Sequence, residues 1–308
     1  MTDVVCLGIL VADAIARPVD ALPPRGELAL VEEIALRGGG CALSTASALA
    51  RLGLSSAVAG KVGADAFGDF LLSLLDERGV DRRAVLRDPA VPTSATVVLV
   101  AGDGERTFLH VRGANARLRG AELDRDLLLS GRALHVGGAL VMPELDGDPT
   151  ARILEEARDR GIVTSLDTAF DATGRWERVL PCLPHLDLAT PSLAEARAVS
   201  GEDEPAAVAA WWRSRGVREV LLTMGERGCY AAGEGYEGHV EPVAVRAVDG
   251  TGAGDAFAAG LLYGKLAGWP LERAARFANA AGALSTTAVG AVEGLLDAAG
   301  TLACAGLE

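Results

Sequence analysis

The most constraining feature of the sequence is a regular alternation of strand and helix patterns that begins at Ala133. Short β-rich runs are separated by amphipathic helical patterns such as those at 150–160 and 206–214. Repeated strand–helix units favour a mainly parallel sheet with helices on both faces, because parallel strands need long crossover connections. The sequence therefore predicts a three-layer α/β/α fold, with strands expected at 133–137, 162–167, 186–190, 217–224, 229–232 and 240–248.

The N-terminal part of the chain adds a second group of β-rich runs. A buried-strand run covers 4–11, and a half-exposed strand pattern covers 27–36. Two further runs, 93–100 and 107–111, flank a glycine-rich hairpin signal. These runs are interleaved with the main body, so we expect a single domain over residues 1–308 that carries a small β-sheet lid. The lid is expected at about residues 12–36 and 91–112.

Composition excludes several classes of partner. The chain has 29 Lys and Arg against 42 Asp and Glu, a net charge of −13, which repels phosphate backbones and anionic lipids. No apolar run approaches the roughly 20 residues that span a bilayer, and the N-terminus lacks a basic signal region. We therefore expect a cytoplasmic protein without a nucleic-acid or membrane partner. The spacing of its Cys and His residues matches no zinc site.

The segment 248–266, VDGTGAGDAFAAGLLYGKL, is the most informative for chemistry. Its glycines permit a tight turn, and the N–H groups of residues 252–255 would then be free at the start of a helix. Free N–H groups and the helix dipole together form an anion site, which suits a transferring phosphoryl group. Asp255 could accept the proton of an attacking hydroxyl. The alternative is that Asp255 only caps the helix.

The residues from Asp249 to Asp255, DGTGAGD, resemble the C-terminal signature of the ribokinase-like (PfkB) carbohydrate kinases, except at Gly250. The resemblance implies that Gly252, Ala253 and Gly254 form an anion hole and that Asp255 is the catalytic base. It also implies ATP-dependent phosphorylation of a hydroxyl on a small sugar or sugar-derived substrate, with Mg²⁺ and a homodimer formed through the lid.

The substrate side carries a second resemblance. Gly38–Gly40, followed by a helical run, is similar to the family's N-terminal glycine signature, which implies that Gly39 and Gly40 hold the sugar. Ser44 stands where the family usually has Asn, and a hydroxyl has fewer hydrogen-bonding groups than an amide. Asp13 matches the family's acceptor for a sugar hydroxyl. The alternative for the glycines is a plain turn between a strand and a helix.

The nucleotide and metal side carries weaker motifs. Ser192–Glu195 resembles the family's Asn-x-x-Glu motif, which implies a Mg²⁺ role for Glu195, often through water; the same residues fit a helix capping box. The run 222–228 resembles the family's nucleotide-side turn, although its glycines equally suit a hairpin. The resemblance implies ATP contacts by Thr223, Gly225, Gly228 and Asn279.

Three alternatives stay open on the sequence alone. Asp249 and Thr251, with the loop at 289–290, correspond to a monovalent-cation site of some family members, which makes K⁺ a candidate cofactor. A nucleoside kinase of the same family would share the motifs above. A non-catalytic relative that binds a sugar or nucleotide would share the fold but would have no need of Asp255 as a base.

Overall fold

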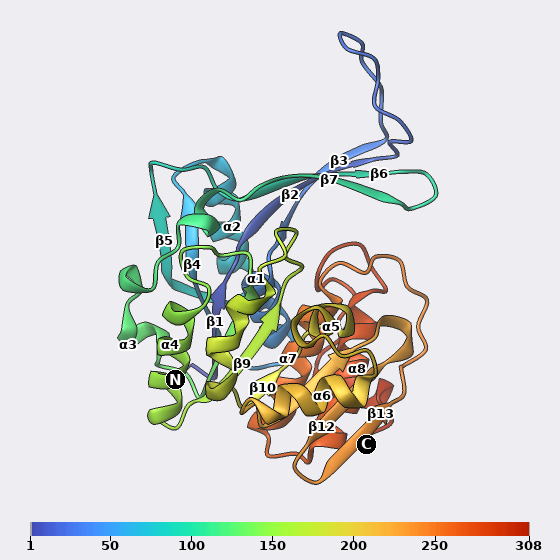
Figure 1. The fold of residues 1–308 in the computed structure, drawn as a ribbon. Helices are drawn as coiled ribbons and strands as arrows, with labels where there is room; N and C mark the ends of the chain where they lie inside the picture. The colour runs from blue at the N-terminus through green and yellow to red at the C-terminus, as the bar shows by residue number, and fades with distance from the viewer. Residues whose placement is uncertain (1, 308) are drawn as a thin grey trace.

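A computed structural model describes residues 2–307, which form two β-sheets and the helices around them (Figure 1). The large sheet has nine strands in the order β13-β12-β11-β10-β9-β8-β1-β4-β5. Pairing is parallel from β5 to β11, and β12 and β13 add an antiparallel edge. The strands are β1 (Val4–Gly8), β4 (Ser56–Gly63), β5 (Asp81–Asp88), β8 (Ala133–Ala139), β9 (Val163–Thr168), β10 (Leu188–Ala189), β11 (Glu219–Thr223), β12 (Cys229–Gly233) and β13 (Tyr236–Val240).

Helices cover both faces of the large sheet, which confirms the predicted three-layer fold. Alternate residues of β1 enter different cores: Val4 and Cys6 face one layer, and Val5 and Leu7 face the other. The first layer contains α1 (Cys41–Arg51), α2 (Ala66–Glu77), α7 (Ala253–Leu266), α8 (Leu271–Ser285) and α9 (Ala298–Cys304); the second contains α3 (Arg125–Leu128), α4 (Asp148–Asp159), α5 (Leu193–Ser200) and α6 (Pro205–Ser214). None of the helices within residues 2–307 combines the length and apolarity of a membrane crossing.

The second sheet has four strands and forms a lid above the large sheet (Figure 1). Its order is β3-β2-β6-β7, and its strands are β2 (Val11–Arg17), β3 (Glu33–Gly39), β6 (Ala95–Val100) and β7 (Arg106–Val111). The register sets Asp13 opposite Arg37 and beside Thr96, so these side chains share one face of the lid. The blue segment between β2 and β3 extends away from the main body in Figure 1.

Three element predictions were wrong in detail. The strand expected at 240–248 is β13, Tyr236–Val240, because a turn at Gly235, with φ of 77°, reverses the chain soon after β12. The run at 4–11 is divided between β1 and β2, which belong to different sheets. The strand expected at 27–36 begins only at Glu33. In addition, β5 was not predicted, since its Arg and Asp residues hide the apolar alternation.

Candidate active site

The turn that enters α7 has the backbone of an anion site. Gly252 precedes the helix in a left-handed conformation, with φ of 74°. The amide of Ala253 donates to Gly250 O at 3.3 Å, whereas among the described residues the amides of Gly252, Gly254 and Asp255 have no acceptor. The free donors are therefore those of 252, 254 and 255, which is the predicted set of 252–255 without Ala253. Free amides at a helix start attract an anion.

Asp255 lies in the first turn of α7 against the start of α1. Only 9 % of its surface is exposed. Burial raises the pKa of Asp255 to about 7, although hydrogen bonds with the side chains of Cys41 and Ser44 oppose the rise. A base whose pKa lies near neutral pH is well matched to accepting a proton from an alcohol.

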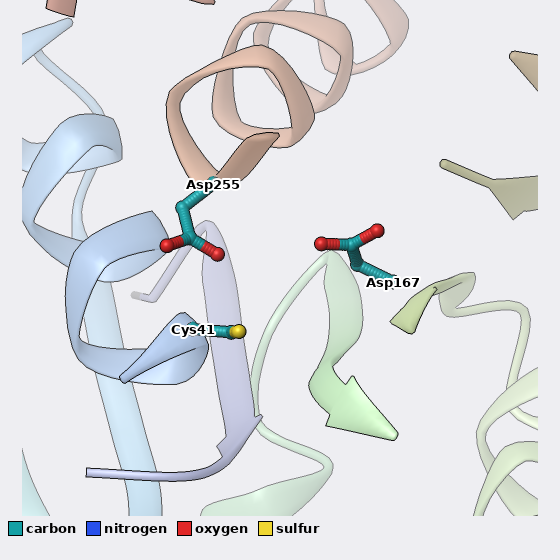
Figure 2. A group of neighbouring side chains, drawn as sticks. All are labelled: Cys41, Asp167 and Asp255. Atoms are coloured by element: carbon teal, nitrogen blue, oxygen red, sulfur yellow. The ribbon is translucent and has the colours of Figure 1, made fainter. Parts of the chain in front are cut away.

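A second carboxylate faces Asp255 across the site. Asp167 lies at the end of β9, and side-chain atoms of Cys41, Asp167 and Asp255 lie within 4.8 Å of one another (Figure 2). Burial raises the pKa of Asp167 well above its usual range, and the charges of Asp255 and Glu195 add to the rise. Asp167 was not among the residues predicted from the sequence. Its position at the carboxyl end of a predicted parallel strand, where ligands of α/β sheets bind, was the available signal.

Glu195 belongs to a helix capping box and also reaches toward this site. Its Oε2 accepts from Ser192 N at 3.0 Å, from Ser192 Oγ at 2.8 Å and from Thr168 Oγ1 at 3.0 Å. Ser192 Oγ in turn accepts from Glu195 N at 3.2 Å, so the capping alternative is confirmed. Carboxylates such as Asp167 and Glu195 are the ligands that Mg²⁺ prefers. The charge of Glu195 adds to the rise in the pKa of Asp167, so the two carboxylates act on each other and could share a divalent cation.

A cavity of about 240 Å³ lies between the inner face of the lid and the turn before α7. Its lining includes Asp13, Arg37, Thr96, Phe108, Asp249 and Gly290. Burial raises the pKa of Asp13 to about 6, with an opposing hydrogen bond from Thr96. A Cβ on Gly39 would collide with the Asp13 carboxylate, which explains the need for glycine there. Ser44, predicted to contact the sugar, is 1 % exposed, and its hydrogen bond with Asp255 lowers the pKa of that carboxyl. Its sugar contact stays a prediction.

The residues predicted to contact ATP lie around the turn after β11 and the end of β13. Thr223 ends β11, and Gly225 and Gly228, with φ of 61° and 77°, form the turn to the antiparallel strand β12. The hairpin alternative is therefore correct for this turn. Asn279 on α8 donates through Nδ2 to Val240 O at 3.1 Å and to Glu241 O at 2.9 Å, so its amide holds the chain after β13. Binding of ATP by these residues stays a prediction.

The residues expected to line a monovalent-cation site have a different partner. Arg106 of the lid donates from Nη1 to Asp249 Oδ1 at 3.0 Å and to Thr251 Oγ1 at 2.7 Å. Burial raises the pKa of Asp249, but hydrogen bonds from Thr251 and Gly290 and the charge of Arg106 outweigh it, so this pKa lies below its usual value. The carboxylate is therefore held ionised beside a guanidinium.

Comparison with known proteins gives a consistent result. The sequence matches the family model "pfkB family carbohydrate kinase" over residues 1–298. It is 32% identical over 297 residues to Fructokinase-1 of Oryza sativa subsp. japonica and 31% identical over 297 residues to Fructokinase-1 of Zea mays; each alignment covers 90% of this chain and 91% of the relative.

Solved structures with a similar fold include a PfkB protein from Polaromonas sp. JS666, with a TM-score of 0.80 and 26% identity over 97% of this chain and 99% of that one. Arabidopsis thaliana ribokinase complexed with ribose and ATP gives a TM-score of 0.86 at 24% identity, over 99% of both chains.

Proposed function

The chain belongs to the pfkB family of carbohydrate kinases, and from this premise we propose that it transfers the γ-phosphoryl group of ATP to a hydroxyl of a small sugar. The resemblance carried by residues 249–255 is thereby confirmed at the level of the family. The observation that carries the finer proposal is the position of Asp255, a buried carboxylate with a raised pKa, directly after free amides at the start of α7.

The proposed chemistry divides between one carboxylate and the turn beside it. Asp255 accepts the proton of the acceptor hydroxyl as its oxygen bonds to the γ-phosphorus, while the bond from that phosphorus to the bridging oxygen breaks and ADP leaves with this electron pair. The Gly252–Gly254 turn, with the amide of Asp255, receives the oxygens of the transferring phosphoryl group, whose negative charge is spread over them. Cys41 and Ser44 hold the Asp255 carboxylate in place through their hydrogen bonds.

Asp167 belongs to the cluster with Cys41 and Asp255, and the charge of Glu195 acts on it. Mg²⁺ is the metal that such carboxylates fit, and we infer that Asp167 and Glu195 hold it, directly or through water. When bound, the ion supplies positive charge that neutralises phosphate oxygens. We propose that ATP is contacted by Thr223, Gly225, Gly228 and Asn279. The hairpin after β11 and the buried side-chain amide of Asn279 lie next to each other. In this assignment Asn279 supports the nucleotide side by fixing residues 240–241.

The sugar is proposed to lie in the cavity under the lid, with Asp13, Gly39 and Gly40 as its partners. Asp13 offers a carboxylate to sugar hydroxyls, and Gly39 leaves room for it. We propose that the chain works as a single domain. Closure of its lid over the bound sugar would exclude water and limit ATP hydrolysis. Fructose is the first acceptor to test, since the similar curated proteins are named fructokinases.

A homodimer through the lid is supported by the lid's outer face. Residues that alternate with the cavity-lining ones are apolar and exposed: Ile34 at 75%, Val97 at 42%, Leu109 at 61% and Val111 at 46%. Contiguous exposed apolar side chains favour a protein partner. A second copy is the partner we propose, because pairing through this outer face leaves the inner cavity free for substrate.

The decisive experiment is an ADP-release assay with ATP and Mg²⁺ across fructose, ribose, 2-keto-3-deoxygluconate, an inositol and adenosine. Turnover with a sugar that Asp255→Asn abolishes supports the proposal. Turnover with adenosine alone would favour the nucleoside-kinase alternative. Thermal stabilisation by a sugar without any ADP release would instead favour the non-catalytic binding protein.

A further inference from the structure

One side chain ties the lid directly to the turn that leads into α7. Arg106 is the first residue of β7, at the tip of the β6–β7 hairpin, where it pairs with Val100. Its Nη1 donates to Asp249 Oδ1 at 3.0 Å and to Thr251 Oγ1 at 2.7 Å. These two acceptors lie within the three residues that precede Gly252, so a lid residue far away in the sequence contacts the loop that begins the anion site.

The contact is a closed network rather than a single surface pair. Thr251 Oγ1 accepts from Arg106 and donates to Asp249 Oδ1 at 2.7 Å, and Thr251 N donates to the same oxygen at 2.9 Å. Asp249 Oδ2 accepts from Gly290 N at 3.0 Å. The Asp249 side chain is only 13% exposed, so its charge is shielded from water and the ionic hydrogen bond is stronger than on an open surface.

The same network reaches the anion site by packing. Ala291 follows Gly290 and lies so close to Gly252 that a Cβ added to this glycine would stand 2.6 Å from the Ala291 Cβ. A shift of Asp249 would move Gly290, and with it the neighbour that fixes the backbone at Gly252. The position of Arg106 is thereby coupled to the position of the amides that receive the phosphoryl group.

The residues around Asp249 do not fit the monovalent cation that the family resemblance suggests. A cation there would share the Asp249 and Thr251 oxygens with a guanidinium, and the two like charges would repel at hydrogen-bond distance. Arginine carries its charge at any physiological pH. The chain thus already holds a fixed positive charge at this place, supplied by the lid.

We propose that Arg106 is a positioning residue that takes the place of a monovalent cation and sets the anion-site turn only when the lid is closed. This inference rests on the proposed kinase function. Phosphoryl transfer would then depend on a closed lid, because the turn loses the positive charge of the Arg106 guanidinium whenever β7 moves away from it. The wild-type enzyme is therefore expected to work without K⁺, and loss of Arg106 is expected to create a K⁺ requirement.

The first test measures turnover at fixed ionic strength in potassium, sodium or choline chloride, with ATP supplied as its Tris salt. Wild-type kcat should vary by less than about twofold among these salts. Arg106→Ala should lose about tenfold in kcat in choline, equivalent to about 1.4 kcal/mol, and should regain most of it in potassium. A merely structural defect would not be rescued by a small cation.

The control for this test is Arg25→Ala, which removes another arginine charge from the lid segment. Arg25 is exposed, and its side chain makes no hydrogen bond or ion pair with the residues that the structure describes. This variant should keep the wild-type rate in every salt. Stimulation of the wild type by K⁺ of more than about twofold would overturn the proposal. So would an Arg106→Ala variant that keeps its rate in choline or is not rescued by K⁺.

The second test needs no catalysis and separates this inference from the kinase assignment. Hydrogen–deuterium exchange should be faster in Arg106→Ala for peptides that cover 95–111 and 248–252, and unchanged in Arg25→Ala. If the wild type phosphorylates no acceptor, the kinase proposal fails, but the exchange rates still test whether Arg106 positions the turn. Unchanged exchange in Arg106→Ala would overturn the positioning role of Arg106 even in an active enzyme.

Discussion

The surroundings of the Asp255 carboxylate are built by three elements that are distant in sequence. The start of α1 contributes Cys41 and Ser44, which hydrogen-bond its carboxylate, and β9 contributes Asp167, which faces it. The first turn of α7 adds the free amides beside it. A carboxylate that served only as a helix cap would accept its own helix's N–H groups; Asp255 instead points toward neighbours from other elements (Figure 2).

Replacing Asp255 by Asn tests its role as the base. The amide has nearly the same shape but cannot accept the hydroxyl proton, so kcat should fall by about 10³-fold, within the range typical of general-base removal. Asp297→Asn is the matched control, because Asp297 caps α9 by accepting from Gly300 N. A steady-state assay with the best acceptor measures both. An Asp255→Asn variant that retains a tenth or more of the rate would contradict the assignment.

The pH dependence of turnover tests the environment of the same residue. The pKa of Asp255 is raised to about 7, so the base is protonated and inactive at lower pH, and kcat/KM for the sugar should fall about tenfold per pH unit below that value. Ser44→Ala removes a hydrogen bond that lowers this pKa, which should move the acid limb to higher pH. A flat profile between pH 6 and 8, or a limb that Ser44→Ala leaves in place, would contradict this expectation.

At the scale of the element, the turn before α7 contains two glycines that look alike in the sequence but differ in their structural role. Gly252 has a left-handed φ of 74° and an added Cβ would meet Ala291 at 2.6 Å, whereas Gly250 has no neighbour within 4 Å of its Cβ position. Gly252→Ala should lower the free energy of unfolding by about 2 kcal/mol and reduce kcat, because strain displaces the free amides. Gly250→Ala should change neither. Urea unfolding and an activity assay measure both effects, and equal behaviour of the two variants would refute the proposed geometry.

The elements that could be predicted from sequence are those whose local signals agree. The glycine turn, the small-residue helix after it and the strand expected at 162–167, which is β9, follow from local chemistry, as does the Ser192–Glu195 capping box. The strand at 236–240 was misplaced because the segment 240–248 is equally β-rich, and only pairing with β12 decides between them. Asp167 was missed for a related reason: nothing local distinguishes it from other acidic residues, and its partner Asp255 is contributed by another element.

At the scale of the whole molecule, the alternation of strands and helices was enough to predict the layers but not the pairing of the lid. The lid joins β2 to β6 in parallel across a long stretch of sequence, and this pairing sorts its side chains onto two faces. Thr96 and Val98 face the cavity, while Val97 is exposed on the other side. The sequence shows the alternation in β6, but only the structure shows which face lines the cavity and which is apolar and exposed.

The outer face of the lid gives a prediction about assembly. If two copies pair through it, a charge placed at Leu109 would be buried without a partner, so Leu109→Asp should convert a dimer into a monomer. Leu296→Asp changes a leucine of similar exposure, 44% against 61%, outside the lid and should leave the dimer intact. Size-exclusion chromatography with light scattering gives the mass directly. A wild-type monomer at micromolar concentration, or a dimer that survives Leu109→Asp, would contradict pairing through this face.

Acid stability of the whole fold should depend on one histidine in the centre of the large sheet. His135 on β8 is fully buried; its Nδ1 lies 3.0 Å from Ser165 Oγ, and its Nε2 has no partner among residues 2–307. Burial lowers the pKa of His135 from 6.5 to about 4. Between these two pH values the imidazole stays neutral in the folded chain but binds a proton in the unfolded chain. The stabilising contribution is complete above pH 6.5 and is lost as the pH falls to about 4, by about 3 kcal/mol in all.

Urea unfolding at pH 7.5, 6 and 5 should therefore show a smaller loss of stability in His135→Gln than in the wild type. His185→Gln, on a partly exposed residue, should keep the wild-type slope. An identical slope in His135→Gln would mean that this site is hydrated or protonated in the native protein.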